Sequence, residues 1–60
     1  MCELKVLQVK DGKSEEIMTE VEKVEVEGRQ IRIIDILGRE KTIEGTIKSL
    51  DMMKNTLQII

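Results

Sequence analysis

Aliphatic and charged residues alternate along most of this chain, and turn residues interrupt the alternation at short intervals. Residues 24–27 alternate valine with glutamate, and Gly28 follows them directly. Asp11-Gly12 interrupts the chain in the same way after the first apolar run. A period of two places successive side chains on opposite faces of an extended strand. Turn signals spaced about eight to twelve residues apart therefore predict an all-β fold, either a small barrel or a sandwich.

The runs between the turns predict about six short antiparallel strands wrapped as a small barrel. A bend is expected near residues 22–23, and the change of phase between Ile33 and Ile34 predicts a bulge or a strand covered on both faces. The isolated Gly45 predicts a kink or a close approach of two backbones at a corner of the barrel. The extended segments are expected at residues 2–9, 15–19, 24–27, 30–37, 40–44, 46–53 and 56–60.

The length of the chain, 60 residues, predicts a single domain that spans residues 1–60. A domain this small buries only a modest fraction of its surface and usually needs a disulfide, a metal or a partner as reinforcement. Cys2 is the one cysteine, so an internal disulfide is ruled out. Aromatic residues are absent, so the core must be built from Val, Ile, Leu and Met. We therefore expect a bound metal, a second subunit, or both.

The charges predict a solvated surface and exclude several classes of partner. Lys and Arg number 10, Asp and Glu number 12, and the formal net charge is −2. This balance argues against nucleic acid binding, because such binding needs a clustered excess of Lys and Arg. No apolar run approaches the ~20 residues of a membrane-spanning helix, and the first residues lack the segments of a signal peptide. We expect a cytoplasmic protein with no membrane partner, in which the thiol stays reduced.

The sequence offers none of the usual sets of catalytic residues. It contains no histidine, so Ser-His and Cys-His nucleophiles cannot be built. The phosphate-binding glycine loop, the CxxC pair and the HExxH zinc motif are also absent. Glu15 and Glu16 are adjacent, so on a strand they point to opposite faces. We therefore expect that the protein is not an enzyme.

The remaining candidate chemistry lies at Met1 and Cys2, which we take as the candidate metal-binding residues. The α-amine of Met1, the backbone nitrogen of Cys2 and the Cys2 sulfur follow one another along the chain, so they can close two fused chelate rings on one metal ion. Mixed nitrogen and thiolate donors suit a square-planar Ni(II) ion. Binding displaces protons from these groups, so the affinity should fall as the pH falls. If the cell removes Met1, Cys2 chelates through its own amine and sulfur.

A second interpretation gives Cys2 no metal. A lone cysteine is most often a small buried hydrophobic residue, and Cys2 is in phase with Leu4 and Val6 on one face of the first strand. The protein is then a metal-free interaction module that docks on a protein partner through an edge strand or an apolar patch. Met52-Met53 is likewise interpreted as core filler in preference to a pair of thioether ligands.

Six short motifs are spread along nearly the full length of the chain: Met1-Cys2-Glu3, Asp11-Gly12, Val21-Glu22-Lys23-Val24 leading to Glu27-Gly28, Asp35-Ile36-Leu37-Gly38, Ile43-Glu44-Gly45-Thr46-Ile47-Lys48 and Leu57-Gln58-Ile59-Ile60. Together they resemble the CooT family of nickel-binding accessory proteins. Each motif is short, and their order and spacing together carry the resemblance. HypC-type chaperones of hydrogenase maturation also begin Met-Cys, but they typically have a proline soon after the cysteine, and this chain has no proline.

The resemblance implies a small SH3- or Sm-like barrel that forms a homodimer. It also implies Ni(II) as the bound metal, with the family's N-terminal cysteine, here Cys2, as the key ligand. The family's namesake assists nickel insertion into carbon monoxide dehydrogenase, so a nickel enzyme such as carbon monoxide dehydrogenase is a candidate client, although the client itself does not carry over. The Sm-like shape also suggests RNA binding, but the acidic balance and the lack of aromatic residues argue against it.

Overall fold

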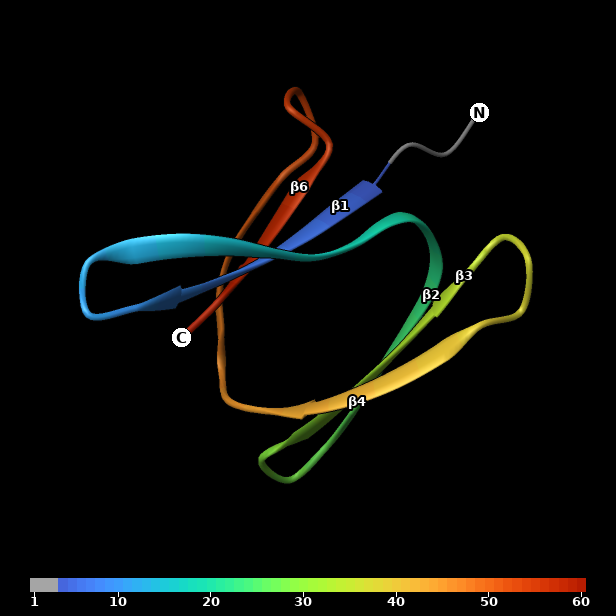
Figure 1. Ribbon diagram of the computed structural model, residues 1–60, viewed down its shortest axis with the longest axis horizontal. Helices are drawn as coiled ribbons and strands as arrows, with labels where there is room; N and C mark the ends of the chain where they lie inside the picture. Colours follow the sequence, from blue (N-terminus) through green and yellow to red (C-terminus); the bar gives the residue numbers. More distant parts are fainter. Residues whose placement is uncertain (1–3) are drawn as a thin grey trace.

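A computed structural model describes residues 4–60, which form one six-stranded β-sheet with no helix among them. The strands lie side by side in the order β4-β3-β2-β1-β6-β5 (Figure 1). The prediction of an all-β domain is therefore confirmed. The strands are β1 (Leu4–Lys10), β2 (Lys13–Glu27), β3 (Gln30–Asp35), β4 (Glu40–Glu44), β5 (Ile47–Asp51) and β6 (Thr56–Ile59).

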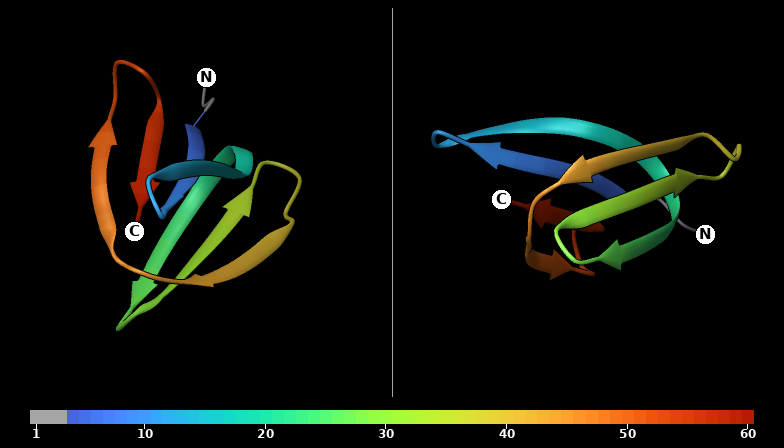
Figure 2. Two further views of the ribbon diagram at one scale, coloured as in Figure 1. Left: turned by 60° about the vertical axis from the view of Figure 1, so that its left-hand side comes forward. Right: turned by 90° about the horizontal axis from the view of Figure 1, so that it is seen from below.

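The sheet is mixed and open, so the prediction of an antiparallel barrel is wrong in two respects. First, β1 and β6 run parallel, with Lys5 opposite Thr56 and Gln8 opposite Ile59. Second, β4 and β5 lie at opposite ends of the sheet and do not pair with each other, although the sheet curls strongly (Figure 2). Alternation describes the two faces of each strand, but it carries no information about which strands become neighbours. The alternation could therefore not predict the direction of paired strands or whether the sheet closes into a barrel.

The long strand β2 joins two segments that the sequence predicted as separate. Its first half pairs with β1 and its second half with β3. Glu20 has a φ of 53°, in the left-handed region, and the pairing with β3 shifts register between Val21 and Lys23. The bend expected near residues 22–23 is therefore present, but it curves one strand without ending it. The Asp11-Gly12 turn between β1 and β2 is confirmed, with φ values of 52° and 76°.

The buried core is aliphatic, as the composition predicted, and comes from β1, β2, β3 and β6. Side chains such as Ile31 and Ile33 are removed from water entirely, and each contributes roughly 1.5–3 kcal/mol. Ile34 points to the opposite face and is half-buried, so β3 is covered in part on both faces and carries the apolar run without a bulge of its own. The buried apolar residues are Val6, Val21, Ile31, Ile33, Leu57 and Ile59.

Gly45 allows two backbones to approach closely where the chain passes from β4 to β5. A Cβ atom at this position would lie 2.5 Å from the Ile60 carbonyl oxygen and 2.8 Å from Cγ2 of Ile59. The amide of Gly45 donates to the Arg29 carbonyl at 2.8 Å, and Thr46 and Ile60 exchange two backbone hydrogen bonds of 2.9 and 2.8 Å. The close approach predicted at this glycine is confirmed.

Candidate functional site

The candidate metal ligands Met1 and Cys2 lie outside the described residues. The nearest described part of the chain is the start of β1 at Leu4. Leu4 pairs with Val21, which pairs in turn with Asp35 at the end of β3. On the other side, the Lys5 amide donates to the Asn55 carbonyl at 2.8 Å. The start of β1 is thus held between β2 and the β5–β6 turn, and the β3–β4 turn lies on the far side of β2 (Figure 1).

The β5–β6 turn is built on the carboxylate of Asp51. One oxygen, Oδ1, accepts hydrogen bonds from the amides of Met53 and Lys54 at 3.0 and 3.1 Å. Met52 and Met53 are 69% and 95% exposed. The interpretation of Met52-Met53 as core filler is therefore wrong, because both residues belong to a turn that projects beyond the sheet. Their thioethers lie on the turn that the Lys5–Asn55 hydrogen bond joins to β1.

The β3–β4 turn is built on a second carboxylate, that of Asp35, which is only 2% exposed. Oδ1 accepts hydrogen bonds from the amides of Leu37 and Arg39 at 3.0 and 2.8 Å, and Oδ2 accepts one from Nε of Arg39 at 2.6 Å. Gly38 completes the turn with a φ of 84°. In the sequence, Asp35 was identified only as part of the motif Asp35-Ile36-Leu37-Gly38, with no role of its own. An Asp three residues before a Gly is a turn signal that could have identified it.

The pKa of Asp35 is lowered from its ordinary value by this set of donors. Burial acts in the opposite direction, because it disfavours the charged carboxylate and raises the pKa. The backbone and side-chain hydrogen bonds from Arg39, with the backbone hydrogen bond from Leu37, outweigh that effect. Asp35 is therefore an ionised and fully occupied group near neutral pH. Its role is to hold the turn, and it is not available as a base or a metal ligand.

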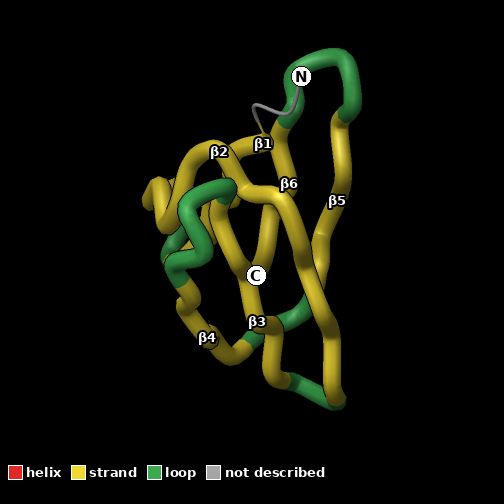
Figure 3. The backbone as a smooth tube through the Cα atoms, turned by 90° about the vertical axis from the view of Figure 1, so that its right-hand side faces the viewer, coloured by secondary structure: helices red, strands yellow, loops and turns green. Residues whose placement is uncertain are grey.

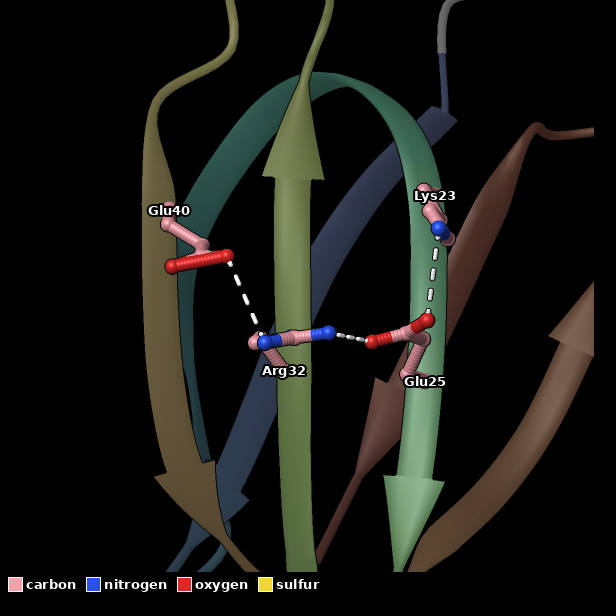
Figure 4. A network of polar contacts seen from close by, with 4 residues as sticks. All are labelled: Lys23, Glu25, Arg32 and Glu40. Atoms are coloured by element: carbon pink, nitrogen blue, oxygen red, sulfur yellow. Dashed lines mark hydrogen bonds and ion pairs between the residues drawn. The ribbon is translucent and has the colours of Figure 1, made fainter.

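An exposed cluster of charges covers the outer face of β2, β3 and β4. Arg32 lies between Glu25 and Glu40, with Nη1 3.6 Å from the Glu40 carboxylate and Nη2 hydrogen-bonded to Glu25, and Lys23 approaches Glu25 to 3.3 Å (Figure 4). The hydrogen bond from Arg32 is the main reason that the pKa of Glu25 is lowered. The charges balance and face solvent, so each pair contributes little to stability. This cluster is a solvated surface of the kind that the interspersed charges predicted.

The part of the chain from residue 4 to residue 60 contains no group of three or more His, Cys, Asp or Glu side chains placed to hold a metal ion. Within the same residues, no helix is long and apolar enough to span a membrane. Cys2 and Met1 therefore stay sequence predictions. The described residues define a small, open, all-β domain with an aliphatic core and two carboxylate-held turns beside the start of its first strand.

Comparison with known proteins identifies the family. The chain belongs to the CooT family, because the family described as "CO dehydrogenase accessory protein CooT" matches residues 1–60. A crystal structure attributed to CooT from Carboxydothermus hydrogenoformans has the same fold, with a TM-score of 0.87 over 97% of this chain and 94% of that chain. The two sequences are 24% identical. No curated protein matches this chain.

Proposed function

We propose that this protein is a homodimeric, cytoplasmic Ni(II)-binding accessory protein that carries nickel to a client metalloenzyme. The observation that supports the proposal best is the family match, which spans residues 1–60 and so includes Met1 and Cys2. The family description names carbon monoxide dehydrogenase, and an enzyme of that kind is the client that we infer. In this proposal Cys2 supplies the thiolate, and Met1 supplies the amine of the chelating terminus.

The chemistry of this donor set agrees with a carrier role. A thiolate with amine or amide nitrogens suits Ni(II) and leaves the metal exchangeable by ligand competition and by protons. Cys2 must stay reduced to act as a ligand, which requires a reducing compartment such as the cytoplasm. The described frame supports the same role, because hydrogen bonds on both sides fix the start of β1 from which the terminus extends.

The residues of the chain favour an accessory role over catalysis. The sequence has no histidine to act as a base near neutral pH. Asp35, the buried carboxylate of the described residues, is fully engaged by Leu37 and Arg39. The charges of the outer face form balanced ion pairs around Arg32. We therefore assign no reaction to the protein.

A titration with Ni(II), followed by ultraviolet–visible absorption, tests the proposal directly. We expect a thiolate-to-nickel charge-transfer band that saturates in the wild type and is lost in Cys2→Ser, because the serine hydroxyl is a poor soft-metal ligand. Met53→Leu is the matched control, since it removes an exposed sulfur and should leave the band unchanged. Stoichiometric nickel binding by Cys2→Ser, or no band in the wild type, would contradict the proposal.

A metal-free interaction module is the second candidate function. Exposed apolar side chains on β5 and on both turns favour it, because such residues often form protein–protein contacts. Under this interpretation Cys2→Ser lowers thermal stability and changes no metal-dependent property. A thermal melt of wild type and Cys2→Ser, each with EDTA and with Ni(II), separates the two candidates. Stabilisation of the wild type alone by Ni(II) supports nickel binding, since only a ligand of the folded state raises Tm.

A further inference from the structure

The outer edge of β4 carries no further strand. β4 ends the sheet on the side away from β5 (Figure 3), and β3 is the one element among residues 4–60 whose backbone lies close to it. The backbone groups that a sheet edge leaves unpaired are a template for another extended chain. A partner that adds a strand to such an edge gains affinity from main-chain hydrogen bonds and specificity from the facing side chains.

The hydrogen bonds at the two ends of the β3–β4 pair show which backbone groups of β4 point outward. The amide of Gly45 donates to the Arg29 carbonyl at 2.8 Å, and the amide of Asp35 donates to the Arg39 carbonyl at 3.0 Å. Both contacts continue the register of the strand pair. Bonded and non-bonded positions alternate along an antiparallel pair, so alternate residues of β4 turn their N–H and C=O groups away from β3. These residues are Glu40, Thr42 and Glu44.

A side-chain contact agrees with this orientation and marks one end of the free edge. Nε2 of Gln8 donates to the Glu44 carbonyl at 3.3 Å, so this carbonyl points away from β3 and is engaged by β1. Thr42, two residues earlier, turns its amide and its carbonyl to the same side. The Thr42 amide is therefore a donor that the β3–β4 pair does not use.

The side chains along this edge select a basic partner. Glu40 and Glu44 lie on the outer face of the sheet, in phase with Thr42 (Figure 4). Two antiparallel copies of β4 paired at Thr42 would set each Glu40 opposite the Glu44 of the other copy, and like charges directly opposite are destabilising. The same carboxylates attract lysine or arginine side chains on an added strand. The edge therefore opposes pairing with a second copy of itself and favours a basic segment.

A hollow of about 760 Å³ on the outer face of β2, β3 and β4 continues the acidic surface inward from the edge. Glu27 and Glu44 lie on either side of Gln30, each directly opposite it. They repeat the arrangement around Arg32, which also lies between two carboxylates, but their central residue carries no charge. Glu27 has no ion-pair partner among residues 4–60, and Glu44 has Arg29 at 4.0 Å. A long basic side chain that enters from the edge would supply the missing cation.

We propose that the free edge of β4 binds an extended basic segment of a partner protein as a further strand. In an antiparallel segment, lysine or arginine residues four positions apart lie opposite Glu44 and Glu40, and the backbone between them bonds to Thr42. The inference adds a protein-binding surface to the proposed function. It does not depend on nickel, because the residues that carry it lie outside the chelating terminus.

Two-dimensional NMR of the protein in EDTA tests the proposal with a synthetic peptide. The peptide has lysines four positions apart with threonine midway between them, and its valine and glutamate face Ile43 and Lys41. A control peptide exchanges every lysine and glutamate. We expect the first peptide to cause saturable shifts of the β4 amides that weaken at about 1 M salt, where charges are screened beyond about 3 Å, and the control to cause none.

Three results of this titration would overturn the proposal. They are the absence of binding at low salt, equal binding of the two peptides, and shifts confined to β5. Shifts of the β4 amides that grow with protein concentration in the absence of peptide would show that a second copy covers the edge, and would overturn it as well.

Thr42→Pro tests the strand pairing itself. Proline removes an amide that points away from β3, so it deletes no hydrogen bond of the β3–β4 pair, and edge strands accept proline at such positions. We expect at least tenfold weaker peptide binding in Thr42→Pro. Thr42→Val is the matched control, because it keeps the amide and should bind the peptide as the wild type does. Equal binding by the two variants would overturn the proposed pairing.

A pair of charge variants tests the same surface even if Thr42→Pro fails to fold. Glu40→Gln combined with Glu44→Gln removes two exposed carboxylates from the edge, and we expect at least fivefold weaker peptide binding. Glu15→Gln combined with Glu16→Gln removes the same charge from the part of β2 that pairs with β1, and should leave binding unchanged. Equal effects of the two double variants would refute the selection by charge.

The same titrations separate the failure of this inference from the failure of the proposed function. Peptide binding is measured in EDTA, so it reports on the β4 edge alone. Peptide binding by a protein that gives no Ni(II) band would leave the edge standing and remove the nickel function. A Ni(II) band without peptide binding would do the reverse.

Discussion

The β3–β4 turn and the β5–β6 turn are both stabilised by an aspartate carboxylate, but this carboxylate is buried in the first turn and only partly buried in the second. Each turn is organised by an aspartate that accepts backbone hydrogen bonds, Asp35 in the β3–β4 turn and Asp51 in the β5–β6 turn. Each also exposes a pair of apolar residues at its tip. Asp35 is buried and has Arg39 as an additional partner, whereas Asp51 is only partly buried. The β3–β4 turn therefore packs against the core, whereas the β5–β6 turn extends from the edge strand β5.

The largest expected difference between the turns follows from removing the two carboxylates. Asp35→Ala leaves the amides of Leu37 and Arg39 without their acceptor next to the core, and an unsatisfied buried donor costs more than a lost exposed bond. Asp51→Ala exposes its amides to water, and we expect it to lower the free energy of unfolding by about 1 kcal/mol. We expect the loss for Asp35→Ala to be at least twice as large. Urea unfolding of both variants measures this, and equal losses would show that burial makes no difference.

Acid should weaken the first turn through Asp35. Its pKa is lowered in the folded protein, so its ionised form adds stability that is fully present above the ordinary pKa of about 3.8. That stability is lost as the pH falls through the lowered folded value. We therefore expect the stability difference between wild type and Asp35→Asn to be constant near neutral pH and to shrink under strongly acidic conditions. Urea midpoints measured between pH 7 and about pH 2 follow this difference. A constant gap between wild type and Asp35→Asn down to the lowest pH would contradict this account.

The smallest expected effect concerns the apolar tips. Leu37→Ser and Met53→Ser each remove a side chain that is at least 73% exposed, so each should change the stability of the monomer by less than about 0.5 kcal/mol. Urea unfolding of the two variants measures this, and a loss well above that value for either variant would show that its tip packs against the sheet.

The sequence predicts local features of this fold well and non-local ones poorly. The strand periodicity, the turn at Asp11-Gly12 and the close approach at Gly45 depend on a few neighbouring residues, and the structure confirms all three. The parallel pairing of β1 with β6 depends on contacts between the two ends of the chain, which no short pattern encodes. The open edge at β5 is a property of the whole sheet for the same reason.

The candidate site likewise combines residues that the sequence suggested with features that it did not predict. Met1 and Cys2 were proposed from donor chemistry and family resemblance, and they stay predictions. The described surroundings contain two features that the sequence analysis missed, the occupied carboxylate of Asp35 and the exposure of Met52-Met53. All the donors to Asp35 lie in the turn that follows it, on Leu37 and Arg39, but its burial depends on packing that no short pattern shows. Met52 and Met53 looked like core because hydrophobicity alone does not show that a residue lies in a turn.

The parallel pair β1–β6 has a consequence for how this protein is made in the cell. β1 lies near the start of the chain and β6 near its end, yet the two strands are neighbours inside the sheet. A nascent chain on the ribosome therefore has to expose β6 before β1 gains its second neighbour. Contacts between distant parts of a chain also slow folding. The hydrogen bond from Lys5 to Asn55 can form only then, so the start of β1 is fixed on both sides only once β6 and the turn before it have been synthesised.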